Sequence, residues 1–311
     1  MPDCQEGVTM SYRLRADESV ETGIQRIVIE QIDRARRELQ DEDRVAAIHH
    51  FRQRCKKIRA ALRLVRPALG KHFARENERF RDLGRSVAGA RDSQMLVETF
   101  DHLLEQGDGG SDRRRFAPIR NVLVARRTAA LESSDNEDRI ARLDKAMMEA
   151  RAEVPEWSLR REGFAAVRGG LDRTYYRAGR SMHVARKKAR ASDYHEWRKR
   201  VKYHRYHCDL LRNIWKAPMK ARGQELHRLS DLLGEEHDLA VLEEVVRNPA
   251  NDLARYKYQP ALLELISQRR AALQQAVMPL GQCLFDEQSE ALGDRLALYW
   301  QAWQTMWATG Q

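Results

Sequence analysis

Residues 49–59 read HHFRQRCKKIR and residues 195–205 read HEWRKRVKYHR, and the two stretches align without a gap at an offset of 146 residues. Repetition at a fixed offset reveals architecture that helical periodicity alone does not. The register continues to Glu98 and Glu244. The chain is therefore predicted to hold two copies of one helical unit, at about residues 15–155 and 160–308, after an N-terminal tail of residues 1–14.

Residues that favour helices dominate the whole chain, whereas alternating β-branched runs are scarce. Proline and glycine separate long segments. The predicted fold class is all-α, with helices long enough to form bundles. The expected helices span residues 17–40, 43–66, 70–89, 92–105, 113–132, 136–152, 162–191, 194–216, 219–234, 238–247, 258–278 and 287–307.

The charge balance indicates the class of partner. The 311 residues include 56 Lys and Arg against 46 Asp and Glu, which gives a net charge of +10 and a pI of about 9.6. Such a protein favours polyanions, among them nucleic acid, anionic membrane or a phosphate polymer. No apolar run reaches the roughly 18 residues of a membrane span, and no signal-peptide pattern opens the chain. We therefore expect a cytoplasmic protein without a membrane partner.

The four cysteines are scattered and have no C-x-x-C spacing. This distribution favours reduced thiols over a disulfide framework or a zinc site. We expect neither a bound metal nor a cofactor. The cysteines are Cys4, Cys55, Cys208 and Cys283.

The repeated cations share one face of each helix. At 100° per residue they fall within an arc of about 80°, beside the apolar stripe that should form the core. No Asp or Glu occurs from residue 44 to residue 75 to offset this charge. Because like charges at helical spacing repel, a doubled series of this kind favours a ligand face over a solvated one. The arcs contain His49, Arg52, Lys56, Arg59 and Arg63 in the first copy and His195, Arg198, Lys202 and Arg205 in the second.

With these motifs the sequence resembles the CHAD family, the conserved histidine α-helical domain, whose signature is a His-x-x-Arg helix start followed by Arg and Lys at helical spacing. A second family feature, a short acidic signal at the start of a later helix, matches RDSQML from Arg91 and HDLAVL from His237. The resemblance covers about residues 15–308. It implies two pseudo-symmetric bundles of long antiparallel helices whose basic faces meet at a central groove, and it implies binding of inorganic polyphosphate.

The two arcs are the expected polyphosphate-binding residues, and association with polyphosphate granules in the cytoplasm would follow. If the arc histidines touch phosphate, they should gain charge, and binding should strengthen below about pH 7. Weaker candidates for the same site are Lys57, Arg91, Arg173, Arg177, Lys199 and His237. Arg54 and Arg200 fall outside the arcs and are not expected to contact the ligand.

Two alternatives remain at this point. His195 with His237 and Asp238 matches the ligand types of a metal-dependent phosphohydrolase, but the repeat places Arg91, which cannot bind a metal, at the position of His237. The carboxylates Asp92 and Asp238 are more simply helix N-caps, with arginine pairing as a second role.

Nucleic acid is the stronger competitor, because any dense cationic groove attracts phosphodiesters. Base stacking, however, needs exposed aromatic side chains. Phe51 and Trp197 fall on the apolar stripes, and only Tyr203 and Tyr206 approach the basic side. Polyphosphate binding without catalysis is therefore the function that the sequence favours.

Overall fold

The computed structural model describes residues 12–310 except 88, 107–109, 135–136 and 250–251. Within these residues the regular structure is entirely helical, which confirms the all-α class. Short 3₁₀ helices η1 (Val154–Glu156), η2 (Arg212–Ile214) and η3 (Asp252–Arg255) separate some of the longer elements. The α-helices are α1 (Val20–Glu38), α2 (Arg44–Leu64), α3 (Arg66–Leu69), α4 (His72–Arg85), α5 (Gly89–Glu105), α6 (Gly110–Ser134), α7 (Glu137–Glu153), α8 (Gly163–Lys188), α9 (Ala191–Leu210), α10 (Lys216–Arg247), α11 (Gln259–Phe285) and α12 (Ser289–Ala308).

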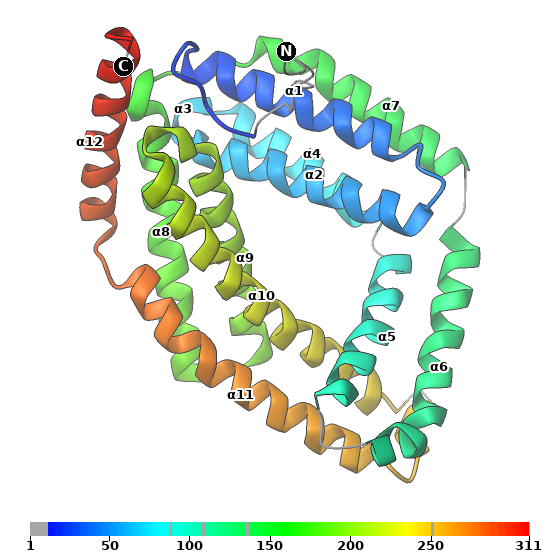
Figure 1. Ribbon diagram of the computed structural model, residues 1–311. Coiled ribbons are helices and arrows are strands. Elements are labelled where there is room, and N and C mark those ends of the chain that lie inside the picture. The colour runs from blue at the N-terminus through cyan, green and yellow to red at the C-terminus, as the bar shows by residue number, and fades with distance from the viewer. Residues whose placement is uncertain (1–11, 88, 107–109, 135–136, 250–251, 311) are drawn as a thin grey trace, which may run out of the picture.

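Helix α10 differs from its counterpart in the first half of the chain. It runs for 32 residues without a break over positions that correspond, at the offset of 146, to both α4 and α5. The expected separate helices at 219–234 and 238–247 are therefore wrong. Gly234 alone costs a helix only about 1 kcal/mol relative to alanine, and no proline lies between Gly234 and the end of the helix at Arg247. In the first half the helix does end, and α5 leaves α4 at a steep angle (Figure 1).

Two hydrophobic clusters hold the helices together, and each contains residues from both halves of the chain. The larger includes buried residues of α1, α2, α4, α7, α8, α9, α12 and the first part of α10. The smaller combines α5 and α6 with the second part of α10 and most of α11, and Figure 1 shows these helices grouped at one end of the molecule. The break between α4 and α5 thus directs α5 and α6 onto helices of the second half.

The two signature helices, α2 and α9, pack against each other. Phe51 of α2 and Trp197 and Val201 of α9 are fully buried, as the apolar stripes predict. A buried polar contact joins the two helices, since His207 Nε2 lies 3.0 Å from the Ala60 carbonyl oxygen. The cations beside these stripes are thereby held on a rigid support.

Helix α8 approaches the end of α2 unusually closely at Gly170. A Cβ atom at this position would lie 1.9 Å from the Leu64 carbonyl oxygen, so only glycine fits. Backbone contact of this kind needs a residue without a side chain. It brings the arginines of α8 beside those at the end of α2.

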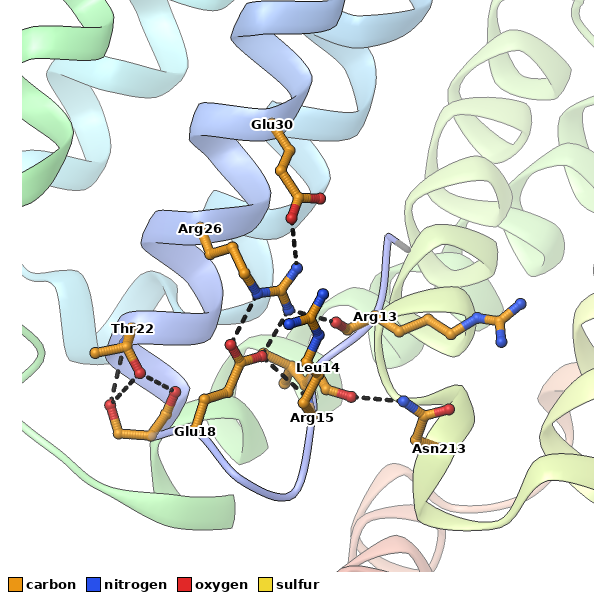
Figure 2. A network of polar contacts seen from close by, with 9 residues as sticks. Arg13, Leu14, Arg15, Glu18, Thr22, Arg26, Glu30 and Asn213 are labelled. Carbon is orange, nitrogen blue, oxygen red and sulfur yellow. Dashed lines mark hydrogen bonds and ion pairs between the residues drawn. The ribbon is translucent and has the colours of Figure 1, made fainter. Parts of the chain in front are cut away.

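The first residues that the structure describes contact the second half of the chain. Leu14, which the sequence analysis assigned to the N-terminal tail, is buried. Its amide donates to the Leu210 carbonyl at 2.9 Å, and its carbonyl accepts a 2.8 Å hydrogen bond from Asn213 Nδ2. Figure 2 shows Arg26 of α1 holding the preceding turn through a 2.6 Å ion pair with Glu18. Residue 14 is therefore part of the packed fold.

Candidate polyanion-binding site

Four cations of the two signature helices gather where α2 and α9 face each other: Arg52, Lys56, Arg198 and Lys202, here called the paired stripe. Burial lowers the pKa of Lys56 to about 8, and repulsion from Arg52 and Arg198 is a smaller cause in the same direction. Burial, followed by repulsion from Arg198, Lys56 and Arg205, lowers the pKa of Lys202 to about 7. Lys56 nevertheless keeps an exposed side chain that a ligand can reach. The repeated cations thus converge from both halves of the chain.

An aspartate from a later helix faces each arginine of the paired stripe. Arg52 Nη1 lies 3.0 Å from Asp92 Oδ1. Burial lowers the pKa of Arg198, and the negative charge of Asp238 partly offsets this effect. Asp92 lies within the first turn of α5, and Asp238 lies within α10. Neither aspartate therefore stands at the N-cap position that was predicted for it. Electrostatic pairing with arginine is the role that both share.

The signature histidines have different surroundings. His49 is exposed, and its ring lies edge-on to that of His50 at 5.8 Å. His195 lies against His237, with ring centroids 4.0 Å apart. Burial and the neighbouring cations, Lys199 first among them, lower the pKa of His195 to about 4, and burial with His195 lowers that of His237 to about 3. His195 is therefore neutral at pH 7 in the free protein, and its expected gain of charge on contact with phosphate stays a prediction.

Arg59 and Arg63 continue the α2 arc and converge on one tyrosine of α9. The guanidinium carbon of Arg63 lies 4.3 Å from the centre of the Tyr203 ring, and that of Arg59 lies 6.0 Å from it. Arg59 also donates to Asn77 Oδ1 at 3.2 Å. Tyr203 therefore stacks with arginine, which leaves its ring poorly placed to stack with a base.

Arg205 and the weaker candidate Lys57 lie together at the far end of the α9 arc. The Arg205 guanidinium lies 4.8 Å from the Tyr206 ring centre. Burial and then Arg54 lower the pKa of Lys57 to about 8, while Asp209 acts in the opposite direction. This end of the arc is therefore partly compensated by a carboxylate.

The weaker candidates Arg173 and Arg177 of α8 form part of a second cationic group. They line a cavity of about 330 Å³ that also contains four further arginines and Tyr203. We call this cavity the arginine pocket. Its six arginines are Arg63, Arg66, Arg81, Arg173, Arg177 and Arg200.

The arginine pocket contains residues that the sequence analysis missed. Arg200 was placed off the ligand face, and Arg66 and Arg81 were not considered. A helical wheel places Arg200 correctly on the side of α9 opposite Arg198, but it does not show that α8 brings Arg177 to that same side. The available signal was the basic pattern of α8, which matched no basic pattern in the first repeat.

Two other candidates contribute less. Lys199 is exposed and forms a 2.5 Å ion pair with Glu196. Arg91 belongs to α5, but its side chain lies outside the described residues.

Another cavity, of about 380 Å³, adjoins the paired stripe between α5 and α10. Arg198 and Lys202 form its cationic side, whereas the acids on its wall come from both helices. These acids limit the width of the cationic surface and keep it close to the α2–α9 contact. They are Glu98, Asp231, Glu235 and Asp238.

The described residues also bear on metal binding and on membrane insertion. No group of three or more His, Cys, Asp or Glu side chains in this part of the chain has the arrangement of a metal site. No helix within it combines the length and apolar character needed to cross a membrane.

The fold and the site together define an all-helical protein with a repeated cationic helix and a cationic surface where the two copies meet. The family model for the CHAD domain matches residues 26–247, which is more than half of the chain, and the protein belongs to this family. The resemblance stated from the motifs is thereby confirmed.

Solved structures show the same fold. The crystal structure of the CHAD domain from the plant Ricinus communis is similar with a TM-score of 0.55 and 21% identity, over 88% of this chain and 92% of that one. PptA from Streptomyces chartreusis is similar with a TM-score of 0.55 and 17% identity, over 86% of this chain and 98% of that one. Comparison with curated proteins gave no match.

Proposed function

We propose that this protein binds inorganic polyphosphate along the paired stripe and does not catalyse a reaction. The observation that carries the proposal is the mutual repulsion between Lys56 and Lys202, one from each signature helix, with Arg198 beside both. Like charges brought together in a partly dehydrated groove raise the free energy of the empty site. A bound anion removes this penalty, because it favours the charged form of each lysine.

The shape of the cationic surface supports an extended ligand. From Arg52 to Arg63 the α2 arc extends about 16 Å at 1.5 Å per residue, and α9 adds cations beside it. A single phosphate would leave most of these charges without a partner. A linear chain with one negative charge at each phosphate meets them in succession through charge-assisted hydrogen bonds.

Nucleic acid remains the competing ligand, but no contact in the site favours it. Phe51 and Trp197 are buried in the core, and Tyr203 stacks with arginine. The surface therefore offers charge without platforms for bases. In the cell, we propose that the protein acts in the cytoplasm and associates with polyphosphate granules.

The proposal is tested by measuring the affinity for long-chain polyphosphate after Arg52→Gln and Arg198→Gln are combined. Loss of two charge-assisted contacts is expected to weaken binding by about 100-fold or more. The matched control combines Arg186→Gln and Arg228→Gln, which remove the same charge from exposed positions outside the site. Equal losses in the two double variants would mean that binding depends on net charge and not on the paired stripe.

A further inference from the structure

The arginine pocket combines strong positive charge with few acids. Arg81 is paired with Glu78 at 2.5 Å, and Arg200 is paired with Glu196. The four others have no ion pair with an acid among the described residues of the protein. These four are Arg63, Arg66, Arg173 and Arg177.

Aromatic rings hold two of these guanidinium groups at the wall of the pocket. Arg63 lies over Tyr203 at 4.3 Å, and Arg66 lies over Phe73 at 4.6 Å. A guanidinium carries five N–H donors, so one that lies over a ring still has donors to offer a ligand. Burial, together with the nearby guanidiniums, lowers the pKa of Arg66 and Arg177. The pocket is thus prepared for several anionic oxygens at once.

The pocket has no equivalent at the other repeat. At the offset of 146, Arg173 and Arg177 correspond to Ile27 and Gln31, and Arg200 corresponds to Arg54. Arg54 is neutralised there, because its Nε lies 3.0 Å from Glu38 and its Nη1 donates to Gln31 at 3.3 Å. Both repeats contribute cations to the paired stripe, whereas the residues of the first repeat that correspond to Arg173 and Arg177 carry no charge.

From this asymmetry we infer that the arginine pocket is a separate site for a terminal phosphate group, either the end of a polyphosphate chain or the tail of a small polyphosphorylated molecule. This inference rests on the proposed function, and it adds a position at which one end of the ligand is held.

The chemistry of a chain end explains the difference between the two sites. An internal phosphate carries one charge, whereas a terminal phosphate has a further ionisation near neutral pH and three acceptor oxygens outside the chain. Arginine binds such a group through two parallel hydrogen bonds, which lysine does not do. The pocket contains only arginine among its cations, while the paired stripe mixes lysine with arginine. With a volume of about 330 Å³, the pocket is at the lower end of small-ligand sites.

The test uses inorganic tripolyphosphate, which consists mainly of chain ends, and measures its affinity by calorimetry. Arg173→Gln combined with Arg177→Gln is expected to weaken its binding by about 100-fold. Lys56→Gln combined with Lys202→Gln, in the paired stripe, is expected to weaken it by less than about tenfold, and wild type should bind one tripolyphosphate tightly. The control is Arg180→Gln combined with Arg186→Gln, on the same helix outside the pocket. Equal loss in the control and pocket variants would overturn the inference.

Phosphorus NMR with a chain of intermediate length distinguishes the two sources of the ligand. Selective broadening of the end-group resonance in wild type, lost in the Arg173 and Arg177 variant, supports polyphosphate ends. Displacement of tripolyphosphate by a nucleoside triphosphate at similar concentration supports a small molecule. If wild type binds long chains but the Arg173 and Arg177 variant binds tripolyphosphate as tightly as wild type does, the inference alone fails. If wild type binds no polyphosphate of any length, the proposed function fails.

Discussion

The pH dependence of polyphosphate affinity should follow the ionisation of Lys202. In the free protein its pKa is about 7, against an ordinary value of 10.5. About half of the molecules therefore carry the charge at pH 7, and about one in 100 at pH 9. A bound polyanion raises the pKa of Lys202 above its value in the free protein. The contribution of Lys202 to affinity is therefore complete below about pH 7, and it is lost as pH rises toward the pKa that Lys202 has in the complex. We expect affinity to fall by up to about 50-fold between pH 7 and pH 9.

The control for this prediction is Lys202→Arg, because a guanidinium stays charged throughout this range. Dissociation constants for long-chain polyphosphate would be measured at pH 6, 7, 8 and 9 at constant ionic strength. Internal phosphates do not titrate over this interval, so the ligand contributes little to the slope. The variant should bind with a flatter profile than wild type above pH 7. A flat wild-type profile, or one that Lys202→Arg leaves unchanged, would refute the reasoning.

Two further predictions concern salt and packing. If the paired stripe contacts four phosphates, affinity should fall about 50-fold between 50 and 200 mM salt, by analogy with single-stranded nucleic acids. Binding titrations over this range would measure the loss. A loss below about threefold would contradict direct charge contacts. Gly170→Ala should lower the melting temperature by about 6 °C or more, because its Cβ would meet the Leu64 carbonyl oxygen at 1.9 Å. In calorimetry the control Gly223→Ala, whose Cβ would approach no closer than 3.8 Å to Asp209 Oδ1, should not lower the melting temperature. Equal melting temperatures of the two variants would argue against the close contact of α8 with α2.

The paired stripe could be predicted from the sequence because it depends on one helix at a time. Helical periodicity places Arg52 and Lys56 on one face, and the repeat places Arg198 and Lys202 on the corresponding face. The apolar stripe beside them indicates which side of each helix packs into the core. Periodicity and repetition together were sufficient to predict that these four cations gather on one surface, while their role as a binding site stays a prediction.

The arginine pocket depends on which helix covers another, and a single-helix pattern does not contain that information. Arg200 lies on the side of α9 that α8 covers, and Gly170 allows α8 to approach the end of α2. The ionisation of His195 has a similar origin, since its pKa depends on burial against His237. Continuous helix α10 was also missed, because packing along its length outweighs the local effect of Gly234.

The most direct test of the central claim is a competition measurement at physiological salt, in which long-chain polyphosphate displaces labelled RNA or DNA from the wild-type protein. At equal phosphate concentration, polyphosphate should displace most of the nucleic acid, because the paired stripe offers charge without base-stacking surfaces. Retention of nucleic acid under these conditions would contradict the account and make nucleic acid the preferred ligand.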